Sequence, residues 1–229
     1  MIYSGVHNFK IIDFENIELS NLNRQTLYVP KDIKCNKTET AKKRLLNINP
    51  NASVDSFNIE LNYPPELNLL NLTKDLYAND ITLVDSLIKW GDYIVSAADY
   101  HGAPYLVNDL CVKNKKPYYW GGVNHFLGEI YNFNPYQQTP CLRCIFGEND
   151  LFNKTKFLRY RTRENQFQGI NLGTTVIATG NFISELIIHD ICDIENPTQG
   201  CYIIFDAYDF EIIKVPIEKD TDCECQKFY

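Results

Sequence analysis

The sequence KIIDFENIELSNLNRQ, from Lys10 to Gln25, joins a short apolar run to a polar cluster. The run from Phe9 to Phe14 is rich in isoleucine and predicts a buried strand. Asp13 stands near its end, where an acid in a Rossmann-like sheet can accept hydrogen bonds from ribose hydroxyls. Arg24, eleven residues further on, carries donors that suit phosphate oxygens. Ribose and phosphate together indicate a nucleotide site.

Composition places the chain among globular proteins and limits its partners. Its 229 residues are 45% hydrophobic and 22% charged, and we expect one domain, 1–229. The net charge of -7 disfavours a nucleic-acid partner, because such proteins usually carry a basic patch. No apolar run approaches the roughly 18 to 20 residues that span a bilayer, and no secretion signal is recognisable. We therefore expect a cytoplasmic protein with no membrane partner.

Strand-like and helix-like segments alternate along the chain. The expected strands are 9–14, 53–59, 92–99, 117–123, 126–133, 202–206 and 210–215. The expected helices are 38–47, capped by Thr38, and 84–89, 103–114 and 171–193. Residues 62–82 are expected to form a loop with helical pieces, and the basic segment from Leu151 to Gln168 is expected to form a crossing loop. This order predicts an α/β, Rossmann-like, doubly wound and mostly parallel sheet with an antiparallel carboxyl-terminal part.

Four of the eight cysteines form two close pairs. The first pair is Cys141 and Cys144, and the second pair is Cys223 and Cys225. Without a secretion signal a disulfide framework is not expected, and the pairs predict a four-thiolate structural zinc site. The second spacing is one residue shorter than usual, and buried free cysteines are the alternative. The isolated cysteines, expected in the core or on the surface, are Cys35, Cys111, Cys192 and Cys201.

Further strings accompany the first and together resemble a known family. KTETA from Lys37, SAADYHGAPYLVND, TPCLRC and GCYIIFDA occur in the order seen in the ThiF/MoeB/HesA family, bacterial relatives of ubiquitin-activating enzymes. The similarity runs from about Gly5 to Cys225, and SNLNRQ is its most specific string. The resemblance implies an adenylyltransferase that uses ATP and Mg²⁺ to activate the carboxyl terminus of a small ubiquitin-like sulfur carrier or a peptide. It also implies a homodimer.

The resemblance assigns roles to individual residues. Asp13 would bind the ribose, Lys37 would meet the phosphates, and Asp99 would hold Mg²⁺. The remaining nucleotide-binding positions would be Ser20, Asn21, Asn23, Arg24, Gln25 and Tyr100, and the zinc ligands Cys141, Cys144, Cys223 and Cys225. Arg24, Lys37 and Asp99 would be catalytic. Each also has a plain alternative, a surface charge for Arg24 or Lys37 and a helix cap for Asp99.

The implied chemistry suits these residue types. A terminal carboxylate has a pKa of about 3.3 to 3.7 and is ionised at neutral pH, so no general base is required. The obstacle is bringing an anion against a polyanionic triphosphate, and catalysis then depends on neutralising charge and aligning the reactants.

Four departures from the family pattern affect these expectations. No G-x-G-x-x-G turn precedes Asp13, and we expect a missing amino-terminal piece, through a late gene start or a fragment. The alternative is a truncated pseudoenzyme whose gap another segment or subunit fills. Pro104 stands where relatives usually carry arginine, and Tyr100 where they carry asparagine. No cysteine lies between Leu151 and Gly169, which favours adenylate formation without thioester transfer.

Two other functions remain open from the sequence. A non-catalytic module would bind a carrier or peptide tail without turning over ATP. A nicotinamide-dependent oxidoreductase is the generic alternative for a Rossmann-like sheet, but the glycine fingerprint that would favour it is not found.

Overall fold

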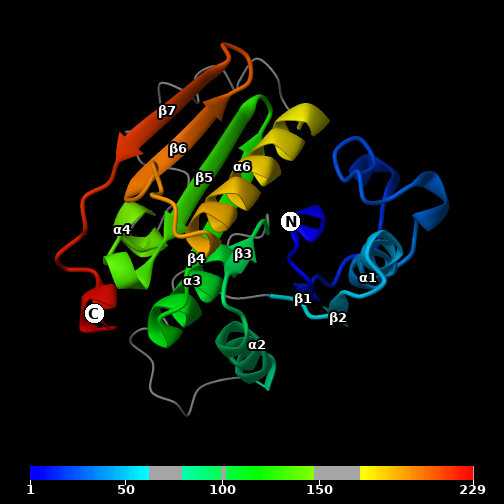
Figure 1. Ribbon diagram of the computed structural model, residues 1–229, viewed down its shortest axis with the longest axis horizontal. Helices are drawn as coiled ribbons and strands as arrows, with labels where there is room; N and C mark the ends of the chain where they lie inside the picture. The colour runs from blue at the N-terminus through cyan, green and yellow to red at the C-terminus, as the bar shows by residue number, and fades with distance from the viewer. Residues whose placement is uncertain (62–78, 99–101, 147–170, 229) are drawn as a thin grey trace. The chain divides into compact units, whose positions relative to one another are not determined.

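The computed structural model describes residues 1–61, 79–98, 102–146 and 171–228. The chain divides into two compact units, Met1–Leu61 and Asn62–Tyr229. The described strands form a two-stranded sheet of order β1-β2 and a five-stranded sheet of order β3-β4-β5-β6-β7 (Figure 1). The two-stranded sheet lies in the first unit and the five-stranded sheet in the second.

The first unit is built on a parallel pair of strands. β1 (Asn8–Ile12) and β2 (Ser53–Phe57) are joined through α1 (Lys37–Ile48), which packs on both. The Asp13 backbone N–H donates to the Phe57 carbonyl at 3.2 Å, so the ladder continues one residue beyond β1. Asp13 therefore lies at the carboxyl end of this strand, as the sequence predicts.

The start of α1 differs from the sequence prediction. The cap is Asn36, whose side-chain oxygen accepts a hydrogen bond from the Glu39 N–H at 3.1 Å. Thr38, expected as the cap, lies within the first turn, and its hydroxyl donates to Asn36 Oδ1 at 2.7 Å. The prediction of Thr38 was wrong because Asn36 already satisfies the orphan donor that a cap must bind.

The sheet of the second unit is mixed. β3 (Ile94–Ser96) runs parallel to β4 (Tyr118–Asn124). The strands that follow are antiparallel neighbours, and they are β5 (Leu127–Phe133), β6 (Cys201–Asp206) and β7 (Glu211–Pro216). The predicted α/β fold with an antiparallel carboxyl-terminal part is confirmed.

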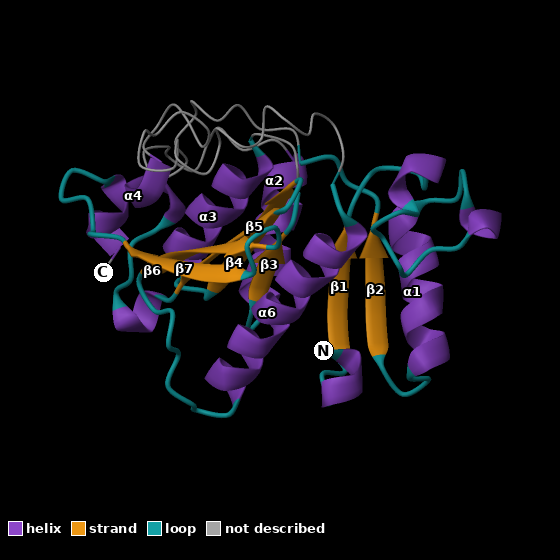
Figure 2. Cartoon of the chain, turned by 90° about the horizontal axis from the view of Figure 1, so that it is seen from above, coloured by secondary structure: helices purple, strands orange, loops and turns teal. Residues whose placement is uncertain are grey.

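Helices cover both faces of this sheet. α6 (Gly173–Ile191) crosses one face, whereas α3 (Ala103–Asn114) and α4 (Leu142–Phe146) lie on the other (Figure 2). On the second face, Phe146 packs edge-on against Trp120 and Tyr202, with ring centroids 6.4 and 5.6 Å apart. Such aromatic pairs stabilise the packing of α4 on the sheet by more than the burial of their apolar surface alone contributes.

The helix predictions are confirmed for α3 and α6, and one other predicted helix is longer than expected. The segment expected at 84–89 belongs to a longer helix, α2 (Asn79–Trp90), so the expected loop ends before residue 79. Short 3₁₀ helices are η1 (Ile2–Ser4), η2 (Leu19–Asn21), η3 (Pro30–Asp32), η6 (Pro135–Gln137) and η9 (Glu224–Phe228). The basic segment 151–168 lies outside the described residues. No helix in the described part of the chain is both long and apolar enough to cross a membrane.

Candidate functional site

Two segments of the first unit pair and bring Lys37 to the end of β1. The Ile17 N–H donates to the Cys35 carbonyl and the Lys34 N–H to the Ile17 carbonyl, both at 2.8 Å. The Lys37 N–H then donates to the Glu15 carbonyl at 3.0 Å. These bonds place the first residue of α1 beside the acidic turn that follows β1.

The Lys37 side chain is enclosed by carboxylates. Its ammonium bonds to the Glu15 carboxylate and lies 3.9 Å from Asp13 Oδ2. The Lys37 side chain is 7% exposed, whereas that of Glu15 is 54% exposed. Tyr28 O–H donates to the Lys37 carbonyl at 3.2 Å, and burial together with the Asp13 charge raises the pKa of Tyr28 to about 12. A buried cation thus stands beside the acid expected to bind ribose.

The turn around η2 holds Arg24 through local bonds. Asn21 is buried, and its Oδ1 accepts from the Glu18 N–H at 3.0 Å. Arg24 Nη1 donates to the Ser20 carbonyl at 2.8 Å and to Asn23 Oδ1 at 3.1 Å. Hydrogen bonds within the turn therefore orient the Arg24 guanidinium. The Asn21 side-chain oxygen also bonds within this turn.

The other predicted nucleotide residues have different outcomes. Gln25 Oε1 is buried and has no hydrogen-bond partner within the described part of the chain. Such an orphaned acceptor is costly unless a ligand or a water supplies a donor. Asp99 and Tyr100 lie outside the described residues. The structure thus brings together Asp13 and Lys37 of the predicted set.

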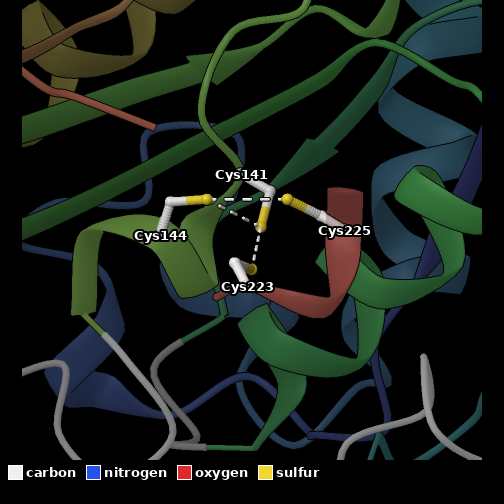
Figure 3. Close-up of side chains that lie close together, drawn as sticks. All are labelled: Cys141, Cys144, Cys223 and Cys225. Atoms are coloured by element: carbon white, nitrogen blue, oxygen red, sulfur yellow. Dashed lines mark hydrogen bonds between the residues drawn. The ribbon is translucent and has the colours of Figure 1, made fainter. Parts of the chain in front are cut away.

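The four predicted cysteines converge in the second unit. Cys141 and Cys144 lie at the start of α4, and Cys223 and Cys225 lie at η9 near the carboxyl terminus (Figure 3). Their sulfur atoms all lie within 4.8 Å of one another. Closest approaches are 3.5 Å between Cys144 and Cys225 and 3.7 Å between Cys141 and Cys223.

These distances fit a tetrahedral metal site. Zn–S bonds of about 2.3 Å place the sulfurs of a tetrahedral site about 3.8 Å apart. Burial raises the pKa of the Cys141 thiol, whereas hydrogen bonds from Cys141 and the second pair lower the pKa of Cys144. A cation would compensate four clustered thiolates, and four thiolates leave no open position for a substrate. The cluster can therefore hold a metal ion in a structural role.

A buried polar cluster on α3 supports the first pair. Arg143 forms a two-bond ion pair with Asp109, and Asn108 Oδ1 accepts from the Leu142 N–H at 2.8 Å. Sequence reasoning missed these residues. The available signal was a polar Asn-Asp pair inside the otherwise apolar segment YLVNDLCV.

Comparisons with known proteins place this geometry in context. A probable molybdopterin-synthase adenylyltransferase of Porphyra purpurea is 32% identical over 140 residues, which is 61% of this chain and 32% of that protein. A sulfur carrier protein adenylyltransferase of Thermus thermophilus is 23% identical over 227 residues, 97% of this chain and 74% of that protein. The chain thus spans about a third of the length of the Porphyra protein.

The fold also matches a solved structure. E. coli MccB, determined with ATP, superposes with a TM-score of 0.70 at 21% identity, covering 97% of this chain and 60% of MccB. At this identity the likeness concerns the fold, and it agrees with the Rossmann-like prediction. The ThiF family model matches residues 1–226. A match over nearly its whole length shows that this chain belongs to the ThiF family.

Proposed function

We propose that this chain activates a carboxyl terminus as an acyl-adenylate at the expense of ATP. A carboxylate oxygen attacks the α-phosphorus, the bond to the bridging oxygen breaks, and pyrophosphate leaves. Two relatives are named adenylyltransferases, and the similar fold of MccB was determined with ATP. The substrate is the carboxyl terminus of a small ubiquitin-like sulfur carrier or a peptide. The name of the Thermus relative supports the carrier.

The juxtaposition of Asp13 and Lys37 carries this proposal. Asp13 at the carboxyl end of β1 accepts from the ribose, and the ammonium 3.9 Å from it is available to an adjacent phosphate. The Lys37 ammonium bonds to the Glu15 carboxylate. Because the Glu15 side chain is half exposed, it can yield the cation to a phosphate at small cost.

The remaining assignments complete the proposed site. Arg24 neutralises developing charge, and Gln25 Oε1 gains a donor from the nucleotide. Asp99 holds Mg²⁺ beside Tyr100. Ser20, Asn21 and Asn23 line the phosphates. Zn²⁺ occupies the four-cysteine cluster, and the protein works as a cytoplasmic homodimer of single-domain chains without thioester transfer.

A second candidate is a binding module that holds a carrier or peptide tail without turning over ATP. One observation favours it. The Lys37 ammonium contacts two carboxylates, Glu15 and Asp13, so its charge is already balanced. A triphosphate would have to compete with these carboxylates for the ammonium.

ATP–pyrophosphate exchange tests the proposal. Exchange is expected only when a sulfur carrier ending in glycine is present, and Arg24→Ala, Lys37→Ala and Asp99→Ala should each abolish it. Lys43→Ala is the matched control, because Lys43 is an exposed lysine on the same helix as Lys37. Normal exchange in folded Arg24→Ala and Lys37→Ala proteins would remove the proposed roles. Carrier binding without ATP binding would favour the module.

A further inference from the structure

We propose that Asn108, Asp109 and Arg143 hold the first cysteine pair in its metal-binding arrangement. The inference rests on the proposed metal site. It assigns positioning roles to three buried residues that do not themselves bind the ion.

The ion pair fixes Arg143 in direction as well as position. Its Nε donates to Asp109 Oδ1 and its Nη2 to Asp109 Oδ2, each at 2.7 Å. The two side chains are 2% and 0% exposed. Two parallel bonds define the plane of a guanidinium, which a single charge contact does not. Arg143 also lies over the Tyr105 ring, 4.8 Å from its centroid, so α3 holds it through both its edge and its face.

Asn108 holds Leu142, the residue that precedes Arg143 in α4. Its Oδ1 accepts from the Leu142 N–H at 2.8 Å, at the first position of α4, where no intrahelical acceptor exists. Its Nδ2 donates to Asp109 Oδ1 at 3.0 Å, which joins the two anchors. Leu142 and Arg143 are the two residues between the cysteines of the first pair. Both are thus fixed to successive residues of α3, and the direction of each cysteine follows.

The buried pair of Arg143 and Asp109 has a geometric role that does not depend on its contribution to stability. A buried ion pair is often no more stabilising than well-packed apolar residues of similar volume. The guanidinium also lies close enough to Cys141 for the two charges to interact. The two parallel bonds to Asp109 add a fixed orientation of Arg143, one of the two residues between Cys141 and Cys144.

The second pair, Cys223 and Cys225, lies in a turn whose hydrogen bonds join residues close together in the sequence. The Cys223 N–H donates to the Asp220 carbonyl at 3.2 Å, and the Gln226 N–H donates to the Cys223 carbonyl at 3.0 Å. Gln226 Nε2 returns to the Asp220 carbonyl at 2.8 Å. The turn is also joined to α3 and to the first pair, because η9 packs against α3 and a backbone hydrogen bond from Asp220 reaches Cys144. Cys225 is fully buried, as Cys141 is, whereas Cys223 is partly exposed.

The test replaces both charges at once. Asp109→Leu with Arg143→Met leaves no unpaired buried charge, so the protein is expected to fold and to bind one ion. Transfer of zinc to a chromophoric chelator should be about tenfold faster or more, as when groups that orient ligands are removed. In the Co²⁺-substituted protein, the thiolate charge-transfer and ligand-field bands should shift. Asp32→Leu with Arg44→Met, which removes a pair joined at 2.6 Å in the first unit, should change neither readout.

Arg143→Lys separates orientation from charge. Lysine keeps the cation but cannot form two parallel bonds, so its zinc transfer rate and Co²⁺ spectrum should resemble those of the double variant. It also supplies the comparison if the double variant does not fold. Wild-type transfer rates and spectra in whichever of these variants folds would overturn the inference. A wild-type protein that holds no metal in any of these assays would instead refute the metal site itself.

Discussion

Gly128 of β5 lies so close to Thr179 of α6 that a Cβ atom on the glycine would overlap the threonine hydroxyl. Thr179 is buried, and its hydroxyl donates to the Thr175 carbonyl at 2.8 Å, so it has little freedom to move aside. Gly128→Ala should therefore lower the free energy of unfolding by about 1 to 3 kcal/mol, measured by denaturant titration.

Gly180, the next residue of α6, is the matched control. A Cβ atom there would meet no atom within 4 Å. Gly180→Ala should raise the free energy of unfolding by about 0.5 to 1 kcal/mol, because alanine loses less backbone entropy in a helix. A Gly128→Ala protein as stable as the wild type would show that α6 does not approach β5 this closely.

Glu15 competes with a phosphate for Lys37 if the proposed function is correct. Glu15→Gln should tighten ATP binding by about two- to fivefold, the range expected for releasing one partly exposed ion pair. Isothermal titration with ATP and Mg²⁺ measures the change. Glu39→Gln serves as the control, since Glu39 is exposed and bonds to Ser56 instead. Weaker binding of ATP by Glu15→Gln would mean that Glu15 assists the nucleotide rather than competing with it.

The raised pKa of Tyr28 predicts a loss of stability at alkaline pH. The folded state holds the neutral phenol, with a pKa of about 12 against 10.0 for an unperturbed tyrosine. Its contribution is complete below pH 10 and declines as pH rises from 10 to 12. The difference in unfolding free energy between wild type and Tyr28→Phe should shrink over that interval. A constant difference would argue against the effect of burial and the Asp13 charge, and Tyr136→Phe controls for loss of one phenol.

Metal binding by the cysteine cluster predicts one ion per chain. Cys225→Ser should remove it and lower the free energy of unfolding by on the order of several kcal/mol, because a site absent from the unfolded chain couples binding to folding. Elemental analysis and thermal unfolding with and without a chelator measure both effects. Cys192→Ser, which changes an exposed cysteine outside the cluster, should alter neither. Freshly purified wild-type protein with metal content near zero would refute the site.

The sequence predicted those elements whose signals are local. The apolar segment 103–114 begins and ends as α3 does, since its pattern and its flanking polar residues lie within one window. The four cysteines were identified because their pairs are spaced like metal ligands. Helix α1 shows the limit of such signals. Asn36 and Thr38 both suit a cap, and the pairing of 34–37 with 15–17 determines which residue occupies that position.

The contacts that shape both sites could not be predicted in this way. Asp109 and Arg143 are 34 residues apart, and nothing in their spacing indicates that they meet. Glu15 and Lys37 meet because the chain returns to the end of β1 after 22 residues. Such partners depend on how the chain folds back on itself, which a pattern of residue types does not specify.

The cysteine cluster joins positions 82 residues apart, and α6, β6 and β7 all lie between them along the chain. With an ion bound, a single backbone cut between Cys144 and Cys223 would therefore leave two fragments tethered to the same atom. A cut before α6 would leave them joined by the pairing of β5 with β6 as well, so a chelator would remove only one of two links between the fragments.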